Sequence, residues 1–260
     1  MKDHLHNDIQ LSHSPKRIIS LVPSQTEYLY DLGLNDEVVG ITKFCIHPKE
    51  WHQSKVKIGG TKNLHLEKIK SLNPDLVIAN KEENLKEDIK AIQLFCPVWV
   101  SDINTYSEAL QMMIDVSILV GKEERGRSIV NQIEYKKNQF VIGQNNIPKS
   151  AIYFIWRNPY MVVGKETFID EMLSIAGFEN KIVNKNRYPE LSVEELISLN
   201  PEYILLSSEP YPFKQKHAEE LLAIHPQLKI ILADGELFSW YGSRMLKSFD
   251  YFSTLHESTC

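Results

Sequence analysis

Aromatic and arginine side chains gather beside predicted strand ends, where a ligand-binding site is expected. In an open α/β sheet, ligands bind outside the carboxyl ends of the strands. Aromatic rings supply flat apolar walls there, and arginines supply fixed hydrogen-bonding forks for carboxylates or phenolates. Candidate ligand-binding residues are Trp156, Arg157, Tyr188, Trp240, Tyr241 and Arg244 in the second half of the chain, and Phe44 and Lys62 in the first. For Phe44 and for Tyr160, coverage of a core edge is an equally good interpretation.

Motifs for catalysis do not occur in this sequence. It contains no GxSxG elbow, no GxGxxG opening a helix and no GxxxxGK[ST] phosphate loop. Cys45 and His47 offer a nucleophile and a base, but no third group nearby orients them, so a structural thiol is favoured. The histidines, including the His4 and His6 pair, lack metal-ligand spacing. From these patterns we expect no catalytic residues, no metal site and no intrinsic cofactor.

Two glutamates occupy matching places in the two halves of the chain. Glu67 and Glu194 each lie near the start of a predicted helix. A carboxylate there is favourable with the helix dipole by about 0.3–1 kcal/mol, which is the structural explanation. Since Glu195 already fills the capping-box position with Ser192, Glu194 is free to face outward.

The elements that must position these residues alternate between strand and helix. Ser24 with Glu27 predicts a capping box and a helix from Gln25 to Leu32 that stops at Gly33, and Thr167 with Asp170 predicts another helix start. The other predicted elements are strands at 17–22, 36–42, 75–79, 95–101, 150–156, 203–207 and 229–232, a turn at 58–61, and helices at 66–72, 106–120, 168–176, 193–199 and 244–255. This alternation predicts an α/β fold with largely parallel sheets.

A long polar helix predicted over 122–141 separates two α/β halves. Ile129, Ile133 and Phe140 lie near helical spacing, and Gly126 weakens the pattern without breaking it. About 20 helical residues span ~30 Å, which is too long and too polar for an ordinary crossover. We therefore expect two Rossmann-like three-layer α/β lobes joined by a single long backbone helix. The predicted boundaries are a flexible tail at 1–16, an N-terminal lobe at 17–120, the connecting helix at 121–146 and a C-terminal lobe at 147–260.

An internal repeat supports the two-lobe interpretation. Residues 66–78 read LEKIKSLNPDLVI, and residues 193–205 read VEELISLNPEYIL. Glu, Ser, Leu, Asn and Pro recur at matching positions with a constant offset of 127 residues. An offset of this length indicates duplicated lobes rather than a solenoid.

Composition excludes several other classes of protein. The 260 residues carry a net charge of −5 and are 43% hydrophobic, which is typical of a globular protein and unlike a disordered chain. A nucleic-acid binder would need a basic excess. The longest apolar runs fall short of the ~18 residues of a membrane span. Cys45, Cys96 and Cys260 form neither a disulfide framework nor a zinc pattern.

The order and spacing of several segments resemble the substrate-binding proteins of cobalamin and ferric-siderophore ABC importers. These segments are RIISLVPSQTEYLYDLG, IGGTKNLHLEKIKSLNPDLVIA, the long central helix, VVGKETFIDEMLSIAGFEN, ELSVEELISLNPEYIL and SWYGSRML. The resemblance is greatest to the cobalamin-binding type and runs from Arg17 to Leu255. It implies two α/β lobes bridged by a rigid helix, a ligand held in the cleft, and no catalysis.

The resemblance also assigns roles to individual residues. It implies that Glu67 and Glu194 dock into arginine pockets of the membrane permease, and that Tyr188 and Arg244 match an aromatic and an arginine of the cobalamin-binding members. This chain departs from those members at Thr61, where they carry a cleft tryptophan, and at Glu236, near an aspartate of theirs. The Trp156–Arg157 pair is an addition that suits a different or more anionic chelate.

The main hypothesis is thus a monomeric binding protein that delivers a corrinoid or ferric siderophore to an ABC importer. The alternatives are a cytoplasmic carrier or processing protein on the same scaffold, and a chelate-handling enzyme that uses His47 or Cys45. The resemblance implies a periplasmic location. Residues 1–17 lack the apolar h-region of a secretory signal, so a cytoplasmic location is expected if Met1 is the true start.

Overall fold

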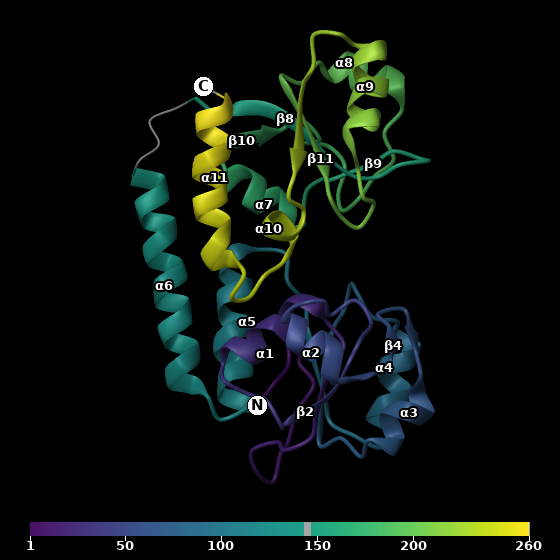
Figure 1. The fold of residues 1–260 in the computed structure, drawn as a ribbon, viewed down its shortest axis with the longest axis vertical. Coiled ribbons are helices and arrows are strands. Elements are labelled where there is room, and N and C mark those ends of the chain that lie inside the picture. Colours follow the sequence, from purple (N-terminus) through teal and green to yellow (C-terminus); the bar gives the residue numbers. More distant parts are fainter. Residues whose placement is uncertain (143–146, 260) are drawn as a thin grey trace. The chain divides into compact units, whose positions relative to one another are not determined.

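The computed structural model describes residues 1–142 and 147–259, and its chain divides into two compact units. Unit 1 comprises Met1–Ile103, Ser107–Ile133 and Tyr241–Arg244, and unit 2 comprises Asn104–Tyr106, Glu134–Trp240 and Met245–Cys260. Figure 1 shows the ribbon of both units and labels many of their elements. Part of the predicted 121–146 helix, at 143–146, and Cys260 lie outside the described residues.

Unit 1 is built around a parallel sheet whose strands follow the order β3-β2-β1-β6-β7. Its strands are β1 (Ile18–Ser20), β2 (Val38–Ile41), β3 (Val56–Lys57), β6 (Leu76–Asn80) and β7 (Val98–Ser101), with a small hairpin of β4 (Gly59–Gly60) and β5 (Asn63–Leu64). Its helices are α1 (Pro23–Asp31), α2 (Lys49–Ser54), α3 (Leu66–Ser71), α4 (Lys86–Gln93), nearly all of α5 (Tyr106–Leu119) and the first half of α6 (Glu123–Ile142). The predicted strands of the first half are confirmed, whereas α2, α4 and β3 were not predicted.

Unit 2 repeats this plan with the parallel strand order β10-β8-β11-β12. Its strands are β8 (Lys149–Trp156), β9 (Met161–Val162), which pairs antiparallel with β8, β10 (Phe178–Asn180), β11 (Tyr203–Ser207) and β12 (Lys229–Ala233). Its helices are α7 (Phe168–Ile175), α8 (Val193–Leu199), α9 (Gln215–Ile224), α10 (Glu236–Ser239), α11 (Met245–Thr259) and the second half of α6. The predicted α/β class with parallel sheets is confirmed.

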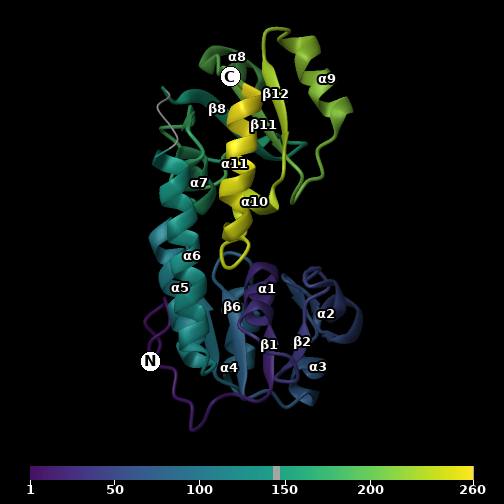
Figure 2. The same cartoon turned by 60° about the vertical axis from the view of Figure 1, so that its left-hand side comes forward.

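Helices cover both faces of the sheet in unit 2. On one face, Phe154 and Leu206 of the strands form a buried cluster with Leu196 of α8 and Leu221 of α9. On the other face, Tyr153 meets Phe238 of α10 with ring centroids 5.1 Å apart, and Phe238 in turn contacts Phe252 of α11. Figures 1 and 2 show α7 and α11 on the opposite side of these strands from α9. Strands buried on both faces explain the continuous apolar runs in the sequence.

Strand order reverses at equivalent places in the two sheets. In unit 1 the chain places β2 and β3 on one side of β1 and then β6 and β7 on the other. In unit 2 it places β10 on one side of β8 and then β11 and β12 on the other. Such a reversal opens a crevice at the carboxyl ends of the two central strands, and ligands bind there. Those ends are Ser20 and Asn80 in unit 1, and Trp156 and Ser207 in unit 2.

The sequence repeat corresponds to a structural repeat. Ile18 of β1 pairs with Leu76 of β6, and Ala151 of β8 pairs with Tyr203, which lies 127 positions after Leu76. The helix preceding each of these second strands ends in a left-handed asparagine, Asn73 with φ 46° and Asn200 with φ 42°. The shared Asn-Pro segments therefore perform the same turn in both units.

Gly126 allows α6 to lie close to its neighbours in unit 1. A Cβ at this position would come within 2.3 Å of the Ser117 side chain of α5 and 2.9 Å of the Tyr28 hydroxyl of α1. The glycine that weakened the helical pattern in the sequence is thus explained by a close approach.

The second half of α6 packs against α11 inside unit 2, as Figures 1 and 2 both show. Lys136 Nζ donates to Asp250 Oδ2 at 2.6 Å, and the rings of Phe140 and Phe252 lie 6.0 Å apart. Among the described helices, α6 included, none has the length and apolarity needed to cross a membrane.

Helix starts show where local prediction succeeded and where it failed. Thr167 caps α7 by accepting from the Asp170 N–H, and Ser192 forms a full capping box with Glu195 on α8, both as predicted. The predicted capping box of Ser24 and Glu27 is wrong, because α1 begins at Pro23 with Val22 as N-cap. The Glu27 carboxylate instead binds Arg244, a partner that a local pattern does not reveal.

Two further expectations about unit 1 need correction. Gly59 and Gly60, expected in a turn, form strand β4, so the hairpin turn falls at Thr61 and Lys62. Residues 1–9, expected as part of a flexible tail, are folded onto unit 1, because Asp3 and Ile9 are buried and the His4 N–H donates to the Val100 carbonyl at 3.1 Å. An aspartate that accepts bonds within its own turn gives this polar segment a fixed form.

Candidate functional site

Trp156 presents an open aromatic face at the strand reversal of unit 2. It is the last residue of β8, and 41% of its surface is exposed. The Tyr211 ring supports it edge-on, with ring centroids 5.7 Å apart. Tyr211 is itself fixed by its N–H, which donates to the Ile155 carbonyl at 3.3 Å. A supported but exposed ring of this kind can stack on a flat ligand.

Arg157, beside Trp156, is engaged within unit 2. Its Nη2 donates to Glu220 Oε2 at 2.6 Å. Its Nε is buried and has no hydrogen-bond partner among the described residues. A ligand carboxylate at this position would therefore compete with a carboxylate of the protein itself.

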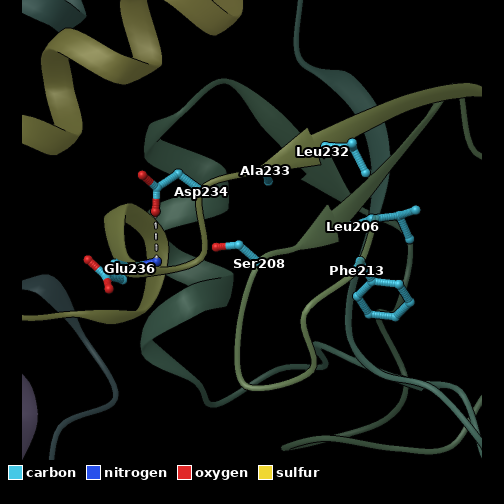
Figure 3. A pocket seen from close by; sticks show the side chains of 7 residues that line it. All are labelled: Leu206, Ser208, Phe213, Leu232, Ala233, Asp234 and Glu236. Atoms are coloured by element: carbon cyan, nitrogen blue, oxygen red, sulfur yellow. Dashed lines mark hydrogen bonds between the residues drawn. The ribbon is translucent and has the colours of Figure 1, made fainter. Parts of the chain in front are cut away.

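A pocket of about 450 Å³ opens at the carboxyl ends of β11 and β12, and Figure 3 shows its lining. The residues that line it are Leu206, Ser208, Phe213, Leu232, Ala233, Asp234 and Glu236. Glu236 N–H donates to Asp234 Oδ1 at 3.1 Å, and Gly235 N–H donates to Ser208 Oγ at 2.9 Å. These bonds fix the loop, and the two carboxylates make this pocket suited to hydrogen-bond donors or cationic groups.

The half-buried carboxyl group of Glu209, next to this pocket, binds the indole of Trp240. Glu209 Oε1 accepts from Trp240 Nε1 at 2.8 Å and from Ser239 Oγ at 2.6 Å. Burial raises the pKa of Glu209, and the carboxylates of Glu236 and Asp234 raise it further, against the lowering effect of the two hydrogen bonds. Only 7% of Trp240 is exposed. The structure thus uses the predicted ligand-binding indole to hold its own loop.

Tyr241 and Arg244, from the same predicted loop, belong to unit 1 and are also buried. Arg244 forms a two-pronged ion pair with Glu27, at 2.7 and 2.8 Å. Tyr188 in unit 2 is half-buried, with the guanidinium of Arg187 5.8 Å from its ring centre. The three candidates of the final loop, Trp240, Tyr241 and Arg244, are therefore far less exposed than Trp156.

The first-half candidates lie on loops at the carboxyl side of the unit 1 sheet. Phe44 follows β2, is 50% exposed, and has Lys43 Nζ 5.0 Å from its ring centre. Lys62 is exposed in the turn of the β4–β5 hairpin. Asn84 fixes that turn by donating to the Thr61 carbonyl at 3.0 Å. Both side chains are accessible to a ligand.

The proposed docking glutamates occupy equivalent places in the two units. Glu67 lies in the first turn of α3, Glu194 lies in the first turn of α8, and both are exposed. A hydrogen bond from its own backbone N–H, and then one from Ser192, lower the pKa of Glu194, so it is charged at neutral pH.

The Cys45 thiol is not arranged as a nucleophile. It is fully buried, and its sulfur lies 3.1 Å from the hydroxyls of Thr26 and Thr42. Burial raises its pKa to about 11, against the lowering effect of these hydroxyls. The thiolate is the reactive form, so this thiol is inert at neutral pH. Across residues 1–142 and 147–259, no three His, Cys, Asp or Glu side chains gather in a way that could hold a metal ion.

Tyr211, Glu209 and Asp234 were not identified from the sequence. Glu209 and Tyr211 follow directly after the predicted strand 203–207, and Asp234 follows the strand 229–232. Their position after parallel strands was the available signal, since the carboxyl ends of such strands lie at one edge of a sheet.

Comparisons with known proteins show which family and which solved structures share this architecture. A family model described as "Periplasmic binding protein" matches residues 18–229. An uncharacterized ABC transporter substrate-binding lipoprotein of Bacillus subtilis, YvrC, is 30% identical over 213 residues, which cover 78% of this chain and 67% of the relative. A vitamin B12-binding protein of Vibrio parahaemolyticus is 24% identical over 205 residues, covering 77% and 74%. The solved periplasmic heme-binding protein RhuT from Roseiflexus superposes with a TM-score of 0.78 at 22% identity, over 94% and 99% of the two chains, which shows a common fold.

Proposed function

This chain belongs to the periplasmic binding protein family, and on that premise we propose that it captures a metal chelate for an ABC importer. The ligand classes considered are a corrinoid, a haem and a ferric siderophore. Members of this family are binding proteins rather than enzymes. The buried thiol of Cys45 agrees with that role, so the enzymatic alternative is not favoured.

The observation that carries the proposal is the exposed ring of Trp156 at the strand reversal of unit 2. Corrinoids and haem present broad, flat macrocycles, and catecholate siderophores present aromatic rings. A ring that is fixed from behind by Tyr211 loses little conformational entropy when such a face stacks on it. Within unit 2 we assign Trp156 as the main aromatic contact and Tyr188 as a further ligand contact.

The charges at the strand ends favour a corrinoid over an anionic chelate. Arg157 is paired with Glu220, and Arg244 is paired with Glu27. The carboxylates of Asp234 and Glu236, which line the pocket of Figure 3, bring further negative charge to these strand ends. A corrinoid carries peripheral primary amides, which donate to carboxylates, whereas haem propionates and catecholate or carboxylate siderophores would be repelled.

We propose that Glu67 and Glu194 dock on the permease subunits of the importer. Their support is the equivalent placement of the two side chains in the repeat and their exposure. Exposed carboxylates steer association with a cationic partner surface and contribute little to folding.

The proposed place of action is outside the cytoplasm. The support is the family match and the YvrC relative, which is named a lipoprotein. A cytoplasmic carrier on the same scaffold would not reach the outer face of a membrane permease, so this alternative is not favoured.

Calorimetric titration of the purified chain with four probes tests the proposed function. The probes are aquocobalamin, haemin, a ferric catecholate siderophore and a ferric hydroxamate siderophore. We expect one equivalent of aquocobalamin to bind and to be recovered chemically unchanged. Trp156→Ala should weaken binding, whereas Tyr135→Ala, which removes an exposed ring from α6, should not. Binding of none of the probes, or recovery of an altered corrinoid, would overturn the proposal.

A further inference from the structure

Residues 3–9, called the strap below, form a compact turn attached to the edge of the unit 1 sheet. Asp3 Oδ1 accepts from the N–H groups of Leu5 at 3.0 Å and Asn7 at 2.8 Å, which closes the turn. Strand β7 is the edge of the sheet, and the His4 N–H donates to its Val100 carbonyl at 3.1 Å. Ile9 at the other end of the strap is buried. The strap thus covers part of a strand edge that would otherwise be open.

The His4 imidazole holds the strap to two further elements. Its Nδ1 lies 3.1 Å from the carbonyl oxygen of Asp102, just after β7. Its Nε2 lies 3.6 Å from Asp115 Oδ2 on α5. The ring also rests edge-on against the buried Trp99, with ring centroids 5.2 Å apart. The imidazolium donates from Nδ1 to the Asp102 carbonyl and at the same time carries the positive charge that the Asp115 carboxylate attracts.

The charged groups that face His4 are mostly acidic. Asp115 and Glu108 approach from α5, and the Asp102 carboxylate is already paired with Lys81 at 2.5 Å. Burial lowers the pKa of His4, but the bonds to Asp115 and to the Asp102 carbonyl, together with the charges of Asp115 and Glu108, raise it by more, so the net pKa is raised. Within the strap itself, the Asp3 carboxylate is occupied by its own turn.

We propose that the strap is a pH-sensitive fastening, held to β7 and α5 by protonated His4 and loosened when His4 loses its proton. A group whose pKa is higher in the attached state stabilises attachment fully below its free pKa of about 6.5, and this contribution is lost as pH rises through the attached pKa. Attachment is therefore tightest in acid and weakens towards alkaline pH.

This inference concerns residues outside the region shared with the family. The family model matches residues 18–229, so the strap precedes it. Loss of the strap frees the Val100 carbonyl and exposes the β7 edge, a surface that can pair with another strand. The proposal does not depend on which ligand the protein binds.

Amide hydrogen exchange on the whole protein tests the fastening between about pH 5.5 and pH 8, the range in which histidine titrates. After correction for intrinsic exchange rates, we expect the protection of the His4 and Ile9 amides to fall as pH rises. The total fall should be about tenfold for each pH unit by which attachment raises the His4 pKa. His4→Gln and Asp115→Asn should remove this dependence. His13→Gln is the matched control, because His13 is exposed and its Nδ1 contacts only the neighbouring Ser14 carbonyl among the contacts seen.

A proton NMR titration of the histidines supplies the second readout. The His4 pKa should lie above the ordinary histidine value of about 6.5 in the native chain and should drop in Asp115→Asn. The proposal is overturned if His4 titrates at or below this ordinary value, or if Asp115→Asn keeps the pH dependence of exchange. The Met1 ammonium also donates to the Ile9 carbonyl at 2.9 Å, and a pH dependence that persists in His4→Gln would come from a group other than His4 and would contradict the proposal.

Discussion

Arg244 holds Glu27 in a buried, two-pronged ion pair that joins positions 217 residues apart in the sequence. Nε donates to Oε2 at 2.7 Å, and Nη2 donates to Oε1 at 2.8 Å. Both side chains are at least nine-tenths buried, and both belong to unit 1. The pair ties the Tyr241–Arg244 segment to α1, so the arginine has a structural role in the free protein.

Arg244→Ala should therefore destabilise the free protein. It leaves the Glu27 carboxylate buried without its partner, and breaking a buried pair on one side costs about 3–5 kcal/mol. Urea unfolding followed by circular dichroism measures this change. Arg127→Ala is the control, because the Arg127–Glu123 pair is exposed and its loss should cost less than ~1 kcal/mol. If Arg244→Ala unfolded like the control while losing ligand affinity, the arginine would be a ligand contact as the sequence led us to expect.

Trp156→Ala should weaken ligand binding, whereas Trp240→Ala should lower the stability of the fold. Trp156 is exposed at the proposed site, so its loss should raise the dissociation constant for aquocobalamin by about 30-fold or more, the effect of a 2 kcal/mol hot spot, with little change in the melting temperature. Trp240 is buried, so its loss should cost about 3–5 kcal/mol of stability and leave Glu209 one donor short. Calorimetry and thermal melting distinguish the two, and equal effects on both measurements would refute the division of roles.

Charge reversal of the docking glutamates should separate transport from binding. Glu67→Lys and Glu194→Lys change exposed side chains, so folding and ligand affinity should stay within the error of measurement. Ligand uptake by reconstituted importer should fall in each variant, because rim charges govern encounter with a partner. Glu190→Lys, at another exposed glutamate of unit 2, is the control. A loss of ligand binding in either docking variant would contradict the assignment.

The buried thiols should make stability fall in alkaline solution. Burial raises the pKa of Cys45 to about 11 and that of Cys96 to about 12, whereas both thiols titrate near 8.5 when unfolded. The native state thus binds more protons above pH ~8.5, so the free energy of unfolding decreases as pH rises through this range. Urea melts at stepped pH should show a smaller decrease in Cys45→Ser. Rapid alkylation of Cys45 in the native protein at pH 8 would contradict its burial.

Gly126→Ala should destabilise unit 1 although alanine favours helices. The new Cβ would lie 2.3 Å from the Ser117 side chain, so α6 must move away from α5. Overpacking of this kind costs about 1–3 kcal/mol. This cost at least cancels the ~1 kcal/mol that alanine gains over glycine in helix propensity. Ser128→Ala, on the same helix and exposed, is the control, and Ser117→Gly should rescue Gly126→Ala. A net gain in stability would show that the helices are not in close contact.

The sequence by itself determined the elements and their duplication. Apolar runs placed β6, β8 and β11, and side-chain caps placed α7 and α8, because strand burial and helix capping depend on residues only a few positions apart. The matched Asn-Pro pairs that begin at Asn73 and Asn200 showed, in the same way, that the two halves repeat one order of helix, turn and strand. Exposure of Trp156 at a strand end also followed from local order, since β8 ends there.

Only the tertiary structure decided what the polar partners do. Glu27 fits a capping box by spacing, yet it binds Arg244, and Trp240 fits a ligand site by position, yet it holds Glu209. The strap appears featureless in the sequence, yet His4 finds Val100 and Asp115 on unit 1. Each of these side chains satisfies its hydrogen bonds with groups far along the chain, and the cost of leaving a buried polar group unpaired enforces those choices only once the core has formed.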